Sequence, residues 1–579
     1  MCMGINYKKN RIYSFLFLLV WCLQMLTAVY FCCQKQGFHE DEFYTYYSTA
    51  RTNGLFVEDG AWMEREDYFN EFVVLKGQRF QYGLVRLVQS WDVHPPVYYW
   101  IFHTVCSFFP GRFSKWFGLG INLAAFGLSL FLLRILAMKI TGRNEKLSLL
   151  VCLFYGFTPA VMSSVVFIRM YALLVVFVYL CAILHIGVVQ SRADRLPFFK
   201  FLLPLMIITY LGFLTQYYYF IFLFFMGFAF CLYLLWRDRN LWNCIRYGGS
   251  QAVVFVLAYL TYPSWPGQMF RGQRGAQATS NFFDVSNTLT RISFFWELMN
   301  EYVFGKMLLP LLIILFIMAV YLVWRRNAGA GAGKMQSSEE QSREKQDSEG
   351  QNWKKQSSEE QNWKKQNSEE QNREKQSWRG NDRVVWILLF CAVSGYFLAV
   401  SKTALLLGDT SVRYQMPVYG MAVLLLFGMI WKIAERFGKK GIVAASALVL
   451  LCMLSNLSAL FSGRVVFLYP EAEERLCFAE EQAARNTPVI CLYDAGQSWC
   501  VWDCADEFFE YERIYFASQN DTVPIADAVV AESEALVVYL SGTAEKQEQL
   551  QRILDSNPRL TEYELKYQEK YCDVYYFHG

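Results

Sequence analysis

The chain of 579 residues has few charged residues, since Asp, Glu, Lys and Arg make up only 18% of it. Soluble domains carry roughly a quarter. Histidine is scarce, with five residues, which argues against a structural zinc site. The net charge of +3 and the lack of a basic stripe argue against nucleic-acid binding. No glycine-rich phosphate loop, HExxH motif or paired CxxC motif is present. A soluble enzyme, a structural zinc site and a nucleic-acid binder are therefore poor fits.

The sequence instead contains many long apolar runs. Apolar residues make up 54% of the chain and aromatic residues 18%, and the mean hydropathy is +0.19. A bilayer core of about 30 Å requires roughly 20 apolar residues per helix. Eleven runs approach this length, which predicts a mainly α, polytopic helical membrane protein with about eleven spans: 12–33, 115–138, 147–166, 170–190, 200–214, 217–236, 248–263, 303–324, 384–400, 416–433 and 441–462.

Basic residues predict the orientation of these spans. The first run follows Lys8, Lys9 and Arg11, which the positive-inside rule places in the cytoplasm. A cleaved signal peptide is the alternative, but the run is long and no A-x-A site follows it. Further basic turns lie near 139–146, 192–200, 237–246, 325–326 and 432–440. With eleven spans, all of them are cytoplasmic and the C-terminal tail lies outside the cell, in a protein of the plasma membrane.

One apolar segment, 95–110, does not fit this alternation. It is short, and a crossing there would move every later basic loop to the other side. We therefore expect it to enter the outer leaflet and return, or to lie at the interface. The alternative is an ordinary span that breaks the charge rule.

The runs divide the chain into four parts. We expect a membrane core at 1–326 with an outer loop at 34–114, an insert at 327–383, further membrane helices at 384–463, and an extracytoplasmic domain at 464–579. The insert contains ten-residue repeats of mixed charge and is interpreted as a cytoplasmic linker. The tail combines β-rich runs at 488–494 and 535–541 with a helical stretch at 545–555, which predicts a small α/β domain. Cys491, Cys500 and Cys504 permit a disulfide there in an oxidising compartment, but the sequence leaves the pairing open.

Three adjacent acids, Glu40, Asp41 and Glu42, directly follow the first span. Adjacent carboxylates at a low-dielectric boundary raise one another's pKa, which suits a general base. The alternative is that they complement the dipole at a helix N-terminus. A divalent cation bound by the three carboxylates is a further, weaker expectation, and we otherwise expect no cofactor and no metal.

Further polar clusters lie on the same predicted outer face. His94 precedes two prolines and the pair Tyr98-Tyr99. Arginines on this side go against the charge rule and so require anionic partners. Guanidinium groups match phosphate oxygens in geometry, which makes phosphate capture the expected role of Arg169 with Tyr171, Arg413 with Tyr414, and the loop pair Arg271 and Arg274. For the loop pair, a solvated loop is an equal alternative.

The ordered set of these motifs resembles one superfamily. Asp-Glu after the first span, then D-x-H-P-P-x-Y-Y, R-M-Y-A-L and R-Y-x-x-P are similar to the GT-C glycosyltransferases that use polyprenyl-phosphate sugars, such as protein O-mannosyltransferases and the aminoarabinose transferases of lipid A. The resemblance covers about residues 10–240 and, more loosely, 384–435. It implies that Asp41 is the catalytic base, with Glu42 beside it and Glu40 as a rival, and that His94 lines the donor and acceptor cavity.

The resemblance implies an inverting transfer of a sugar from a polyprenyl-phosphate donor to a glycan, lipid or protein acceptor at the extracytoplasmic face. Two other classes remain open. A transporter or flippase would place its polar groups near the bilayer midplane, with repeats between halves. A non-catalytic assembly or sensor protein would act through the tail and the insert.

Overall fold

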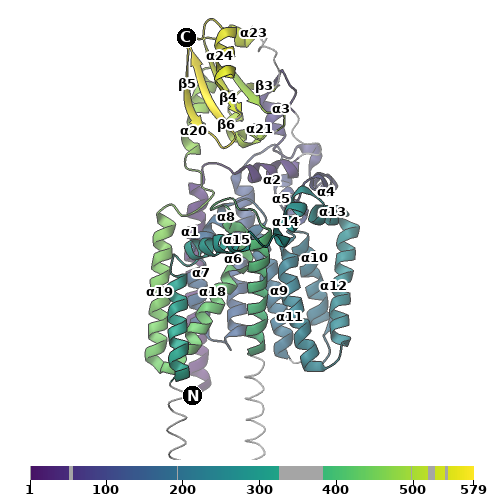
Figure 1. The fold of residues 1–579 in the computed structure, drawn as a ribbon, viewed down its shortest axis with the longest axis vertical. Coiled ribbons are helices and arrows are strands. Elements are labelled where there is room, and N and C mark those ends of the chain that lie inside the picture. The colour runs from purple at the N-terminus through teal and green to yellow at the C-terminus, as the bar shows by residue number, and fades with distance from the viewer. Residues whose placement is uncertain are drawn as a thin grey trace, which may run out of the picture.

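The computed structural model describes residues 2–50, 57–191, 194–324, 383–496, 498–518, 528–541 and 546–579. Figure 1 shows a bundle of long helices joined to a smaller domain that contains a β-sheet. The N-terminus lies at the end of the bundle away from the sheet, and the C-terminus lies in the sheet domain. The predicted insert at 327–383 falls almost entirely outside the described residues.

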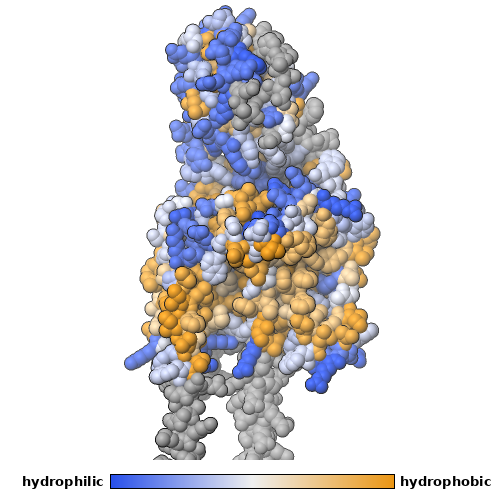
Figure 2. Space-filling model, in the orientation of Figure 1, coloured by the Kyte–Doolittle hydropathy of each residue, from blue (hydrophilic) through white to orange (hydrophobic). Residues whose placement is uncertain are grey.

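The bundle contains all eleven predicted apolar runs as helices or helix pairs. Its elements are α1 (Cys2–Gln34), α6 (Lys115–Ile140), α7 (Glu145–Tyr155), α8 (Pro159–Val166), α9 (Tyr171–Ser191), η2 (Phe198–Leu202), α10 (Leu203–Phe213), α11 (Tyr218–Asp238), α12 (Trp242–Thr261), the helices Leu308–Trp324 and Arg383–Thr403, α18 (Val412–Ala434), η3 (Glu435–Phe437) and α19 (Gly438–Phe461). On the face shown in Figure 2, apolar side chains form a broad band across the bundle.

Within the described residues, six helical stretches are long and apolar enough to cross a membrane, or seven if α7 and α8, bent by 59°, form one span. One stretch, Gly408–Phe461, contains both α18 and α19. The chain reverses between them at Gly438, whose φ of +68° is accessible to glycine without strain. Phe198–Phe213 and Leu308–Trp324 are shorter apolar helices. The chain is thus a multi-pass membrane protein, and the number of eleven spans stays a prediction.

Successive helices of the bundle alternate in direction, which gathers the basic turns at one end. The α6–α7 turn, where Arg134 pairs with Glu145 at 2.9 Å, lies at the end that holds the N-terminus (Figure 1). The turns α11–α12 and α18–α19 lie at the same end. The opposite end holds α2 and the sheet domain. This separation is the one that the charge pattern predicts, although which end faces the cytoplasm stays a prediction.

Short helices cover the end of the bundle beneath the sheet domain (Figure 1). Those of the first loop are α2 (Glu40–Ala50), α3 (Arg65–Asn70), η1 (Lys76–Gln78), α4 (Tyr82–Trp91) and α5 (Val97–Phe108). Those of the second loop are α13 (Trp265–Phe270), α14 (Gln273–Phe283) and α15 (Thr288–Tyr302). A helix of the length of α5, 12 residues, rises only about 18 Å, which is less than the hydrocarbon thickness. Whether 95–110 crosses the membrane stays a prediction.

The tail folds as the α/β domain that the sequence predicts. Its elements are α20 (Ala472–Ala484), β2 (Val489–Tyr493), α21 (Cys500–Asp503), α22 (Ala505–Phe508), β3 (Arg513–Ser518), α23 (Ala528–Ala531), β4 (Ala535–Ser541), α24 (Lys546–Ser556), β5 (Glu562–Gln568) and β6 (Cys572–His578). Strands β2, β3 and β4 are parallel, whereas β6 is antiparallel to β4 and β5.

The sheet has one strand that the sequence analysis did not anticipate. β1 (Ala61–Glu64), from the first outer loop, pairs antiparallel with β3, so that the order is β1-β3-β2-β4-β6-β5. The loop and the tail therefore share one sheet. This shared sheet fixes the tail above the loop that carries the three acids.

Candidate active site

Glu40, Asp41 and Glu42 form the first turn of α2, where negative charge is favoured by the helix dipole. His39 precedes the helix, and its Nδ1 accepts a hydrogen bond from the Asp41 N–H at 3.0 Å. The helix-terminus interpretation is therefore correct as a description of position. The three carboxylates share one helix turn, but their hydrogen-bond and ion-pair partners differ. These partners distinguish their roles.

Glu42 is the most deeply buried of the three carboxylates. Its side chain is fully buried and pairs with the Lys35 ammonium at 2.9 Å. It also accepts the backbone N–H of His39 and that of Ile168, each at 2.7 Å. These donors occupy both oxygens of Glu42 and join α2 to the segment before α9. The catalytic role expected for Glu42 stays a prediction.

Glu40 forms an ion pair with a residue of the sheet domain. Its Oε2 lies 2.6 Å from the ammonium of Lys570, in the turn between β5 and β6. The carboxylates of Glu40, Asp41 and Glu42 thus engage different cations and do not converge on one point. Among the described residues, no group of three or more metal-ligating side chains is arranged around a common centre.

Asp41 lies between two buried arginines. Its Oδ2 is 3.2 Å from Arg413 Nη2, and its Oδ1 is 3.8 Å from Arg169 Nη2. The arginine side chains are each 3% exposed, whereas the Asp41 side chain is 29% exposed. The cluster therefore presents a reachable carboxylate backed by two positive charges that are shielded from water.

Arg169 connects Asp41 to the His94 motif. Its Nη1 donates to the Asp41 carbonyl, to Thr45 Oγ1 and to Tyr99 Oη, at 3.1, 3.2 and 2.8 Å. Its Nη2 lies 3.2 Å from Nε2 of His94. The other ring nitrogen of His94, Nδ1, lies 3.2 Å from Asp92 Oδ2. A proton on Nδ1 satisfies both contacts, because Nδ1 then donates to Asp92 and Nε2 accepts from Arg169.

Arg413 keeps unused hydrogen-bonding capacity. Its Nη2 contacts Asp41 and the hydroxyl of Tyr414, the latter at 3.3 Å. Its Nε and Nη1 are buried and have no hydrogen-bond partner among the described residues, and the same is true of Arg169 Nε. Buried donors without partners are costly. These three donors beside Asp41 therefore favour an anionic ligand such as a phosphate.

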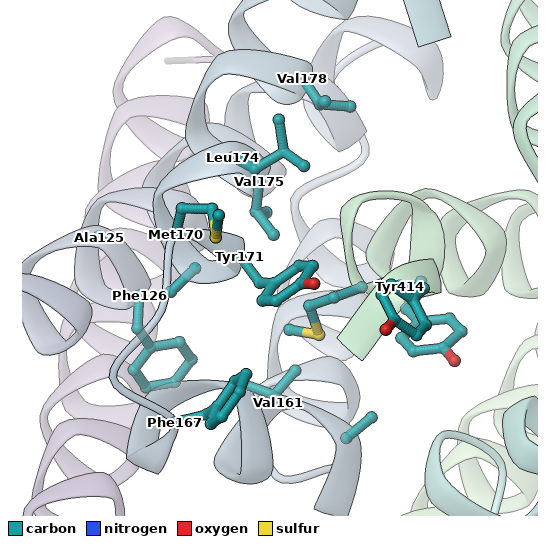
Figure 3. Packing of buried hydrophobic residues seen from close by; sticks show 14 of the residues in the cluster. Ala125, Phe126, Val161, Phe167, Met170, Tyr171, Leu174, Val175, Val178 and Tyr414 are labelled. Carbon is teal, nitrogen blue, oxygen red and sulfur yellow. The ribbon is translucent and has the colours of Figure 1, made fainter. Parts of the chain in front are cut away.

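Aromatic rings enclose this cluster. The Arg413 guanidinium lies 5.0 Å from the centroid of the Phe167 ring and 5.1 Å from that of Tyr414. Tyr171 lies between these two rings (Figure 3), at centroid distances of 6.1 Å to Phe167 and 5.9 Å to Tyr414. Their faces screen the arginine charge from water and attract it electrostatically.

The remaining predicted residues lie farther from Asp41. Tyr98 is buried against Tyr99 and Phe102, and Tyr99, not Tyr98, contacts Arg169. Arg271 and Arg274 are exposed, and no hydrogen bond or ion pair between described residues joins either of them to the cluster. Arg274 is nevertheless close enough to Tyr218 to act on it electrostatically, and Tyr218 packs on Tyr414 at 5.9 Å.

The surroundings hold Asp41 ionised and the histidines neutral. Burial opposes ionisation of Asp41, but the charges of Arg169 and Arg413 outweigh it and hold the pKa of this carboxyl below its usual value. Burial lowers the pKa of His39 to about 3. Burial, followed by the charge of Arg169, also lowers the pKa of His94. Near neutral pH the cluster therefore consists of the carboxylates of Asp41 and Asp92, two guanidinium groups and two neutral imidazoles.

Sequence reasoning missed Thr45 and the capping role of His39, and it named Tyr99 only as part of the pair with Tyr98. Thr45 lies four residues after Asp41, so helical spacing places both on one face of α2 and was a usable signal. Tyr99 directly follows the predicted Tyr98 in α5. Which of the two side chains faces Arg169 depends on the rotation of this helix about its axis.

No protein-family model matches the chain, and no curated protein matches it significantly. Solved structures are similar to it over nearly its whole length. They include ArnT from Cupriavidus metallidurans bound to undecaprenyl phosphate, with 10% identity, coverage of 98% of each chain and a TM-score of 0.48.

They also include the oligosaccharyltransferase of Archaeoglobus fulgidus in the apo form, with 11% identity, coverage of 96% of this chain and 74% of that one, and a TM-score of 0.43. The same organism's AglB, in complex with an inhibitory peptide and a dolichol-phosphate, matches with 10% identity, coverage of 94% and 71%, and a TM-score of 0.36. The resemblance to the GT-C glycosyltransferases that the sequence motifs indicate stays a prediction.

Proposed function

We propose that the chain is an integral-membrane glycosyltransferase that moves a sugar from a polyprenyl-phosphate donor to an acceptor hydroxyl. The observation that carries the proposal is the placement of Asp41 between Arg169 and Arg413 at the sheet-domain end of the bundle. A carboxylate suits proton removal from a hydroxyl. Buried guanidinium groups with open donors suit a phosphate leaving group.

The reaction we propose is a single displacement. The acceptor oxygen attacks C1 of the donor sugar while Asp41 takes its proton, and the bond between C1 and the phosphate oxygen breaks. The electron pair leaves with the polyprenyl phosphate, whose developing charge Arg169 and Arg413 stabilise. Attack opposite to the leaving group inverts the anomeric centre, and no covalent sugar–enzyme intermediate is required.

Donor binding would also activate the base. In the unliganded site, two positive charges stabilise ionised Asp41 and so weaken it as a base. A bound phosphate would share the open donors of both arginines and partly neutralise their charge. Its own negative charge would raise the pKa of Asp41. Asp41 would therefore become a stronger base only when the donor is in place.

The site would face the outside of the plasma membrane. The basic turns lie at the opposite end of the bundle, where the positive-inside rule places the cytoplasm. The polyprenyl donor would then be present in the outer leaflet, and a glycan, lipid or protein acceptor would approach beneath the sheet domain.

The test is sugar transfer by the full chain in proteoliposomes, with a radiolabelled polyprenyl-phosphate sugar and an extract of cell-envelope acceptors. We expect transfer by the wild type, loss of transfer by Asp41→Asn, and retained transfer by Glu40→Gln. The last variant is a matched control because Glu40 is the adjacent carboxylate, paired with Lys570. Retained transfer by Asp41→Asn would remove Asp41 as the base. Uptake of a solute without transfer would favour a transporter.

A further inference from the structure

Four cysteines of the sheet domain lie together in its interior in two close pairs. The Sγ of Cys491 in β2 is 4.0 Å from that of Cys500 in α21. The Sγ of Cys504, the residue after α21, is 3.4 Å from that of Cys572 in β6. All four residues are at most 2% exposed. The tail's other cysteine, Cys477, is exposed.

The two pairs lie at the two ends of one short helix. Cys500 is the first residue of α21, and Cys504 directly follows its last residue, Asp503. Their partners belong to strands β2 and β6, which lie on either side of β4 inside the sheet. Bonds at both pairs would therefore fasten α21 to the sheet at each end.

Fixing α21 to the sheet would also affect the candidate site, because α21 packs on α2. Trp502 of α21 stacks on Tyr44 of α2 with a centroid distance of 5.0 Å. It also meets Tyr47 edge-on at 4.5 Å. Because Tyr44 and Tyr47 share α2 with Asp41, α21 packs directly on the helix of the proposed base.

We propose that the protein carries two disulfides, Cys491–Cys500 and Cys504–Cys572, which fix α21 between the sheet and α2. In each bridge two S–H bonds break and one S–S bond forms. The two protons and the two electrons pass to a disulfide of an exchanging oxidant, which becomes two thiols. Extracytoplasmic compartments supply such oxidants.

Burial indicates that these bridges are structural and not a switch. Burial raises the pKa of the Cys491 thiol well above its usual value, so the folded protein holds little of the thiolate that exchange requires. We therefore expect the bridges to form during folding and to resist reduction afterwards. Cys504–Cys572 spans 68 residues and Cys491–Cys500 spans 9, so the former is expected to stabilise the domain more.

The test is peptide mapping of the full chain, purified without reductant after free thiols are blocked with N-ethylmaleimide under acid-quenched, denaturing conditions. Mass spectrometry without reduction should find a Cys491–Cys500 peptide and a Cys504–Cys572 peptide, with Cys477 alkylated. Reductant in denaturant should release both and add four alkylation sites.

Variants extend this result. Cys477→Ser should leave both linked peptides and the Tm unchanged, whereas Cys504→Ser with Cys572→Ser should lower the Tm and keep the Cys491–Cys500 peptide. Four alkylated thiols in the wild type, a crossed pairing such as Cys491 with Cys572, or stoichiometric zinc held by the four sulfurs would each overturn the proposal. The peptide mapping needs no variant and no measurement of sugar transfer. It can therefore contradict the disulfides even if transfer is found to depend on Asp41.

Discussion

At the residue scale, the candidate site is a carboxylate whose reactivity is set by two arginines. The sequence predicted Asp41, Arg169 and Arg413 because charges beside apolar runs are costly and usually paired. It could not separate Asp41 from Glu42. The partners that occupy Glu42 include the backbone of Ile168, 126 residues away, which no local pattern reveals.

Sugar transfer should require the planar guanidinium group of Arg413, and not only its positive charge. Arg413→Lys keeps the positive charge but loses the open Nε and Nη1 donors, so we expect the transfer rate to fall by about 10²–10³, as for the loss of a charge-stabilising donor. Initial rates in proteoliposomes measure this. Arg271→Lys, at an exposed arginine outside the cluster, should stay within about twofold of the wild type. Equal losses in the two variants would contradict the assignment.

The pH dependence of the transfer rate should report how the neighbouring positive charges act on the pKa of Asp41. Its lowered pKa means that the carboxylate is ionised at neutral pH and is protonated only in strong acid. Arg413→Gln removes one positive charge, which raises the pKa of Asp41. The acid-side loss of kcat/KM should then begin at higher pH than in the wild type. Arg464→Gln, which affects an arginine paired with Glu301, should leave the profile unchanged. An unshifted profile in Arg413→Gln would show that another group limits the rate in acid.

At the element scale, α2 is the part on which the site depends, and several separate contacts hold it. His39 caps its first turn, the Lys35–Glu42 pair joins it to the end of α1 and to the segment before α9, and α21 packs over its tyrosines. The sequence predicted the helices because apolar runs are local signals. It did not predict β1, because four residues in a loop form a strand only through pairing with β3, some 450 residues later.

Breaking the Lys35–Glu42 pair should destabilise the protein. Lys35→Met leaves a buried carboxylate unpaired, a change that costs about 3–5 kcal/mol and should lower the Tm in detergent. The double variant Lys35→Met with Glu42→Gln removes both charges, so its Tm should lie above that expected from adding the two single losses. Additive losses would show that the two side chains do not act as a pair.

At the scale of the whole molecule, the bundle separates a basic end from an end that carries the candidate site and the sheet domain. Charge counting predicted this separation because orientation depends on summed basic residues. The packing of the tail on the first loop could not be predicted, because it depends on tertiary contacts such as Lys570 with Glu40.

Labelling of Cys477 should establish which end faces outward. This thiol is exposed in α20 of the sheet domain, so a membrane-impermeant maleimide should label it in intact cells. A Cys477→Ser variant should lose that label, and a cysteine introduced by Lys440→Cys, at the basic end, should react only after permeabilisation. The reverse pattern would place the candidate site in the cytoplasm.

The measurement that tests the central claim most directly compares donor affinity and transfer rate for Asp41→Asn in the same proteoliposomes. Asparagine removes the base but leaves both arginines without their anion. The account predicts a rate lower by about 10²–10⁴ with donor bound at least as tightly as by the wild type. An unchanged rate, or a loss of donor binding that accounts for the whole loss of rate, would contradict it.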